Sequence, residues 1–94
     1  MSPCRILHHA VNRERNVFRA WHCVVDRDLF GVLVVSVTYG RIGTTGRTIH
    51  HAMTDESAVG RFVQHALRRR ASAERRCGAV YRVIESTGID HLMQ

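Results

Sequence analysis

The spacing of apolar residues changes at Thr54, and this change constrains the fold more than any other feature of the chain. From Thr54 the stretch TDESAVGRFVQHALRRR carries apolar residues that fall on one stripe of a helix. They are Ala58, Val59, Phe62, Val63, Ala66 and Leu67. We therefore predict a helix over about residues 55–70, with Thr54 as its N-cap and Phe62 buried against a sheet.

The segments before Thr54, and one segment after the helix, are typical of β-strands. They are rich in β-branched and aromatic residues and are separated by charged or glycine-containing turns. The predicted strands are residues 4–11, 16–26, 32–39, 46–53 and 79–85. This order predicts an α+β fold, an antiparallel sheet of about five strands with one α-helix packed on one face.

The chain has 94 residues, which suits a single domain over residues 1–94 with one thin core. Residues 86–94 have little pattern, and we expect a loose tail there. No signal peptide is evident, and the longest apolar run, GVLVVSV, is too short to span a membrane. Three cysteines without C-x-x-C spacing argue against a disulfide framework and a zinc ribbon, so we expect a cytoplasmic protein.

The charge points to an anionic partner. The net charge is +6, the pI is about 10.6, and every one of the 14 basic residues is arginine. A guanidinium can donate two parallel hydrogen bonds to a phosphate. A basic domain of this size is therefore a candidate for binding nucleic acid.

The stretch TYGRIGTTGR, residues 38–47, places Gly40, Gly43 and Gly46 three residues apart. It matches neither a P-loop nor G-x-G-x-x-G. One reading is a hairpin whose glycines supply positive φ angles. In the other reading, its backbone amides, Arg41 and Arg47 also meet a nucleic-acid backbone.

The basic run RRRASAERR after the helix stripe has two readings as well. Arg68, Arg69 and Arg70 favour the negative end of the helix dipole in either case. They could be a solvated helix end or a patch that faces phosphate.

We find no set of residues suited to catalysis, so we expect no enzyme, no catalytic residues, no cofactor and no small-molecule substrate. The histidines occur as the doublets His8–His9 and His50–His51. The two side chains of each doublet point to opposite faces of a strand, so neither doublet chelates a metal by itself. A cross-strand site with one histidine from each doublet lacks a supporting Cys or carboxylate, and we expect no metal. Protonation of histidines below about pH 6.5 should make the domain more cationic.

Taken together, the stretches VFRAWHCVV, DLFG, YGRIGTTGR, TDESAVGRF and AVYRVIE closely resemble the WGR domain over about residues 14–85. The resemblance implies a twisted antiparallel sheet with one helix. WGR domains occur in poly(ADP-ribose) polymerases that sense DNA damage, where they bind DNA ends and breaks, and also in bacteria. The chain looks like a stand-alone bacterial form.

The resemblance places Tyr39 at the motif's tryptophan, followed by Gly40 and Arg41. In the DNA-binding relatives this aromatic ring stacks on a terminal nucleotide's sugar while basic groups hold phosphate. Many relatives carry a basic residue at the position of Val37. The implied function is a non-enzymatic, largely sequence-independent nucleic-acid-binding module, with DNA as the expected partner.

The alternative function is protein interaction. Val35, Val37 and Tyr39 alternate along one strand and would form an apolar stripe. If that stripe is exposed, it should bind a second copy of the chain as a homodimer.

Overall fold

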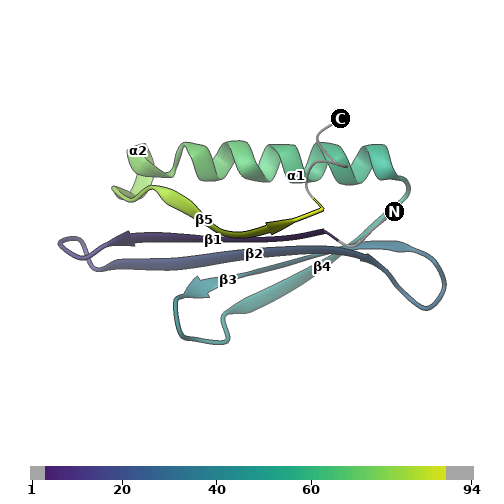
Figure 1. The fold of residues 1–94 in the computed structure, drawn as a ribbon, viewed down its shortest axis with the longest axis horizontal. Helices are drawn as coiled ribbons and strands as arrows, with labels where there is room; N and C mark the ends of the chain where they lie inside the picture. The colour runs from purple at the N-terminus through teal and green to yellow at the C-terminus, as the bar shows by residue number, and fades with distance from the viewer. Residues whose placement is uncertain (1–3, 89–94) are drawn as a thin grey trace.

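The computed structural model describes residues 4–88, which form one five-stranded sheet and two helices (Figure 1). In chain order the elements are β1 (Cys4–Asn12), β2 (Val17–Arg27), β3 (Leu33–Arg41), β4 (Arg47–Met53), α1 (Glu56–Ala71), α2 (Ala73–Cys77) and β5 (Tyr81–Thr87). The strand order across the sheet is β4-β3-β2-β1-β5, and every neighbouring pair is antiparallel. The predicted α+β fold is therefore confirmed.

The path of α1 across the sheet positions everything else. The chain enters α1 from β4 at one edge of the sheet and leaves α2 into β5 at the other edge. The helix therefore crosses one face of the sheet as a second layer (Figure 1). The opposite face of the sheet has no helix over it in the part of the chain that is described.

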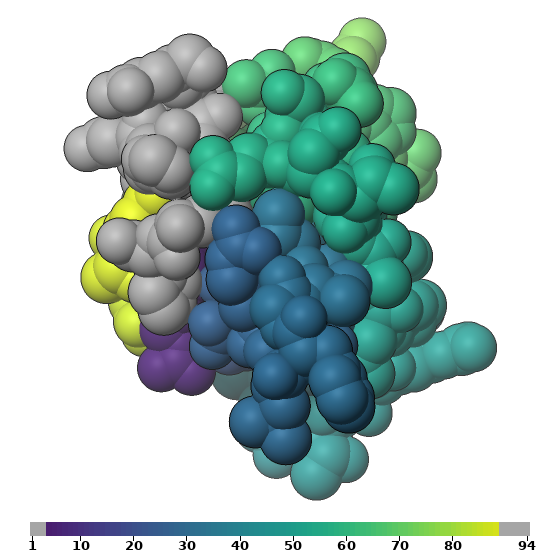
Figure 2. All heavy atoms as spheres, turned by 90° about the vertical axis from the view of Figure 1, so that its right-hand side faces the viewer, coloured from purple at the N-terminus to yellow at the C-terminus, as the bar shows by residue number. Residues whose placement is uncertain are grey.

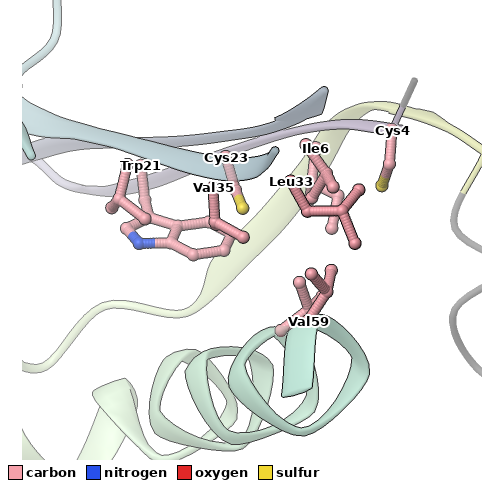
Figure 3. Close-up of a cluster of buried hydrophobic side chains, with 10 residues drawn as sticks. Cys4, Ile6, Trp21, Cys23, Leu33, Val35 and Val59 are labelled. Carbon is pink, nitrogen blue, oxygen red and sulfur yellow. The ribbon is translucent and has the colours of Figure 1, made fainter. Parts of the chain in front are cut away.

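The core lies between α1 and the sheet (Figure 3). Alternate residues of β1, β2 and β3 point toward the helix, as a strand's period of two requires. The buried residues are Cys4, Ile6, Trp21, Cys23, Val25, Leu33, Val35, Val37, Val59 and Val63. Phe62 is partly buried and packs against this cluster, so the predicted phase of the helix is confirmed.

The N-cap prediction was wrong by one residue. Asp55, not Thr54, precedes the first helical residue with extended φ and ψ, and its Oδ1 accepts a 2.8 Å hydrogen bond from the backbone N–H of Ala58. Both residue types are good N-caps, so composition could not decide between them. The short helix α2 was not predicted, because five residues are too few to show a helical period.

The last strand extends to Thr87, two residues past its predicted end. Most of the expected tail, residues 89–94, lies outside the described residues. Within residues 4–88, no helix is both long and apolar enough to cross a bilayer.

The N-cap assignment can be tested by a matched pair of substitutions. Asp55→Ala should lower the free energy of unfolding by about 1 kcal/mol, because it leaves an N–H of the first helical turn without its acceptor. Thr54→Ala, one residue away, should change that free energy by less than about 0.5 kcal/mol. Urea unfolding followed by circular dichroism measures both; equal losses would contradict the assignment.

Candidate nucleic-acid interface

A groove opens between the sheet and α1, next to the β1–β2 turn. That turn, the adjoining ends of β2 and β3, and α1 from Phe62 onward line it, together with Ile49 and His51 of β4 and Tyr81 of β5. We call it the arginine groove. Its volume is about 760 Å³. Five arginines line it: Arg15, Arg19, Arg41, Arg69 and Arg70. Five aromatic rings also line it: Phe18, Trp21, Tyr39, Phe62 and Tyr81.

The exposed fractions along β3 show where the cover given by α1 ends and the groove opens. The helix covers Val35 and Val37, which are 0% and 9% exposed, but Tyr39, two residues further along β3, is 41% exposed. Tyr39 pairs with Trp21 on β2, whose ring is buried. The phenol ring therefore stands at the edge of the core with one side toward solvent.

The apolar stripe considered for a second copy of the chain is not a surface. Val35 and Val37 belong to the core under α1, so only Tyr39 of the three is exposed. The alternation along β3 marked the buried face of the sheet.

Arg41 is held at the rim of the groove by two contacts. Its guanidinium carbon lies 4.7 Å from the centre of the Phe18 ring, and its Nη2 donates a 3.2 Å hydrogen bond to Asn16 Oδ1. Asn16 sits in the β1–β2 turn with φ of +55°. These contacts fix the guanidinium and leave N–H groups that can reach a ligand, since an arginine has five donors.

Arg70 lies deeper, between two aromatic rings. Its guanidinium carbon is 5.2 Å from the centre of the Trp21 ring and 5.5 Å from that of Tyr81. Its Nε is buried and has no hydrogen-bond partner among residues 4–88. Burial lowers the pKa of Arg70, and the neighbouring cations Arg69 and Arg76 lower it further against the opposing effect of Tyr81.

The charge of the groove is therefore uncompensated. An arginine in a protein keeps its proton, so Arg70 stays cationic despite its burial. No carboxylate lines the groove in the described part of the chain. A half-buried cation without a counter-charge attracts an anion more strongly than an exposed one, because water screens it less.

The glycine loop is a tight hairpin between β3 and β4. Gly46 has φ of +65°, and a Cβ atom there would lie 2.6 Å from the carbonyl oxygen of Tyr39. A Cβ on Gly40 would lie 2.8 Å from the Cα of Gly46. The glycines allow these close approaches of backbone to backbone, so the hairpin reading accounts for them.

The residues that we predicted from the sequence do not all lie together. Tyr39, Gly40, Arg41, Arg69 and Arg70 line the arginine groove. Gly43, in the β3–β4 turn, and Arg47, at the start of β4, lie outside its lining. Arg68 lies on a different side of α1, where it shares a shallow hollow with Gln64, Leu67 and Ala71.

The structure also adds residues that we did not predict. Arg15 and Arg19 flank the β1–β2 turn and line the groove. The charged stretch NRERN indicated only a turn, and nothing in it indicated which side the arginines face. Phe18, Trp21 and Tyr81 lay within the stretches that carried the family resemblance, but strand patterns marked them only as packing residues.

His8 departs from the expectation that the histidines make the domain more cationic in mild acid. Its exposed fraction is only 8%, and its Nδ1 has no hydrogen-bond partner within residues 4–88. Burial lowers the pKa of His8, and the cation of Arg70 lowers it further. In the folded chain His8 therefore favours the neutral form.

Comparison with known families now decides the classification. The family model for the WGR domain matches residues 5–76. The chain belongs to the WGR family. No curated protein and no solved structure matches it. WGR domains are nucleic-acid-binding modules in poly(ADP-ribose) polymerases and are not catalytic. The match begins and ends earlier in the chain than the predicted resemblance over residues 14–85, so it includes most of β1 and leaves out β5.

The buried His8 predicts how stability depends on pH. The pKa of His8 is lower in the folded chain than its ordinary value of 6.5. As the pH falls through that value, His8 therefore takes up a proton more readily in the unfolded chain than in the folded chain. The contribution of His8 to stability is therefore constant above about pH 6.5 and decreases as the pH falls. His8→Gln should lose less unfolding free energy between pH 7.5 and pH 5.5 than the wild-type chain, as measured by urea unfolding. An equal loss in both chains would show that His8 does not titrate on unfolding.

Proposed function

We propose that this WGR domain binds nucleic acid through the arginine groove, as a non-enzymatic module with little sequence preference. The single observation that carries the proposal is the composition of the groove: among residues 4–88, five arginines and five aromatic rings line it, and no carboxylate does. Guanidinium groups suit phosphate, and aromatic rings suit the flat faces of sugars and bases. The family's role in poly(ADP-ribose) polymerases supports the same conclusion, and DNA is the nucleic acid that we propose.

Two features of the structure favour contact with the backbone over reading of bases. The apolar stripe of α1 is buried against the sheet, so this helix cannot enter a major groove with that face. The arginines of the groove come from three segments and surround aromatic rings. Contacts of this kind position a nucleic acid without specifying its sequence.

The competing function, a homodimer through Val35, Val37 and Tyr39, lacks its surface because both valines are in the core.

A cytoplasmic location remains part of our proposal. It is supported by the free cysteines, which a reducing compartment maintains.

Salt and Tyr39 provide the first test. The affinity for blunt duplex DNA, measured by fluorescence anisotropy, should fall steeply as salt rises, because phosphate contacts release condensed counterions. Tyr39→Ala should lower the affinity by about 1–3 kcal/mol if the ring stacks on the terminal nucleotide. Because Tyr39 is 41% exposed, the variant should stay folded, which its thermal unfolding will check. An affinity that does not change with salt, or no detectable binding of DNA at low salt, would overturn the proposal.

Arg68 and Arg69 provide a second test in which net charge is constant. The two residues are adjacent, both are exposed, and only Arg69 lines the groove. Arg69→Ala should reduce the slope of log affinity against log salt by about one, as the loss of one phosphate contact does. Arg68→Ala removes the same charge and should leave that slope nearly unchanged. Equal effects would mean that overall charge, rather than the groove, determines binding.

A further inference from the structure

Two apolar side chains stand fully in solvent at the end of the molecule opposite the arginine groove. Leu29 is 100% exposed and Phe30 is 90% exposed. Both lie in the β2–β3 loop, shown in blue in front of the sheet and below the start of α1 in Figure 2. A single exposed apolar residue is ordinary, but two adjacent ones without any cover mark a contact surface.

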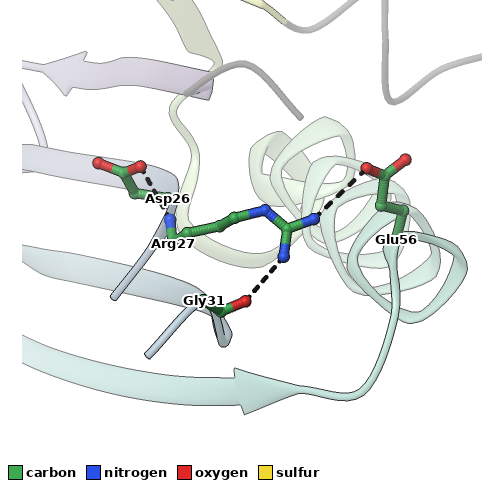
Figure 4. Close-up of polar contacts among 4 residues, drawn as sticks. All are labelled: Asp26, Arg27, Gly31 and Glu56. Atoms are coloured by element: carbon green, nitrogen blue, oxygen red, sulfur yellow. Dashed lines mark hydrogen bonds and ion pairs between the residues drawn. The ribbon is translucent and has the colours of Figure 1, made fainter. Parts of the chain in front are cut away.

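The loop that carries them is braced. Asp28 Oδ1 accepts hydrogen bonds of 2.8 and 3.0 Å from the backbone N–H groups of Phe30 and Val32. Arg27 Nη1 donates a 2.7 Å hydrogen bond to the carbonyl oxygen of Gly31, and its Nη2 lies 3.9 Å from Glu56 Oε1 on α1 (Figure 4). A partner would therefore meet a loop that is already ordered, which lowers the entropic cost of binding.

The surroundings of the loop are acidic, although the whole chain is basic. Asp26, near the end of β2, and Asp28, within the loop, precede Leu29 in sequence, and Phe30 lines the same hollow as Asp55 and Glu56 at the start of α1. Arg27 is the one cation in that hollow among the described residues, and it contacts Glu56. This end therefore presents an apolar tip with more carboxylates than cations beside it.

The arginine groove presents the complement of this tip. Aromatic rings and guanidinium groups line it together, with Arg41 over the Phe18 ring and Arg70 between Trp21 and Tyr81, and no carboxylate of the described residues lines it. The β2–β3 loop and the groove lie at opposite ends of a molecule whose longest extent is 45 Å (Figure 1). The loop cannot reach the groove of its own chain, so this contact can form only between two copies.

We propose that the chain self-associates head to tail, with Leu29 and Phe30 of one copy seated in the arginine groove of the next. The rings and the apolar tip bury apolar area, and the carboxylates beside the tip meet the arginines. A pair of copies joined in this way keeps one free groove at one end and one free loop at the other, so the contact propagates instead of closing as a symmetric dimer. This inference goes beyond the proposed binding of nucleic acid, with which the loop competes for the groove.

Sedimentation velocity without nucleic acid tests the proposal over a concentration series at low salt. The wild-type chain should show a mass that rises with concentration. Leu29→Ser combined with Phe30→Ser should weaken this association by about 100-fold, because two apolar side chains lose their burial. Ile84→Ser changes an apolar residue on β5 that is 54% exposed, and it should associate as the wild type does.

A mixing experiment separates the head-to-tail contact from any other. The loop variant keeps an intact groove, whereas a groove variant with Arg19→Glu and Arg69→Glu keeps an intact loop. Each variant alone should be monomeric, and their equimolar mixture should form a one-to-one dimer that grows no further. A mixture that stays monomeric would overturn the proposal, as would a wild-type chain that is monomeric throughout the series or a loop variant that associates like the wild type.

Duplex DNA distinguishes this proposal from the binding function. The loop variant should keep its affinity for duplex DNA, because its changes lie at the far end of the molecule. Adding DNA to the wild-type chain should dissociate the assemblies, because the DNA and the β2–β3 loop of a second copy both occupy the groove. Assemblies that grow with DNA bound would overturn the shared groove, and a chain that assembles without binding DNA would leave self-association standing alone.

Discussion

The packing of Val59 and Val63 of α1 against the inner face of the sheet is the interaction on which the rest of the structure depends. Both side chains are wholly buried, and they meet Ile6, Val25 and Val35 in the core. Small domains have thin cores, so a chain of this length depends on few such contacts. The helix that makes them also lies, with α2, between the edge strands β4 and β5 in the chain, so this part of the chain passes from one edge of the sheet to the other.

The extent of the cover that α1 gives the sheet creates the candidate site. Val37 is buried, whereas Tyr39, two residues further along β3, is 41% exposed. The crossing leaves a corner of the inner face open, and the basic last turn of α1 forms one wall of the opening. The same arginines that favour the negative end of the helix dipole thus become available to a ligand. Stability and the proposed binding use the same residues for different reasons.

The molecule is polar along its length. Its arginine groove and its β2–β3 loop, with the carboxylates beside it, lie at opposite ends of the molecule (Figure 1). The reason is that successive turns of an antiparallel sheet lie at opposite ends of the strands. The turns after β1 and β3 share one end, and the turn after β2 lies at the other, beside the start of α1. A difference in charge between successive turns therefore becomes a difference between the two ends, and both the proposed binding of nucleic acid and the proposed head-to-tail contact rest on it.

The sequence by itself determined the five strands and the long helix, because periods of two and 3.6 are local properties of a chain, but five residues were too few to indicate α2. It indicated the helix stripe around Phe62, the glycine hairpin and the prominence of Tyr39, Gly40 and Arg41. It could not determine which arginines share a side, since Arg15 and Arg19 meet Arg69 and Arg70 only after the sheet and helix pack. The exposed fraction of a side chain is likewise a tertiary property. Val37 and Tyr39 lie on the same face of β3, and only the position of α1 buries the first and leaves the second partly exposed to solvent.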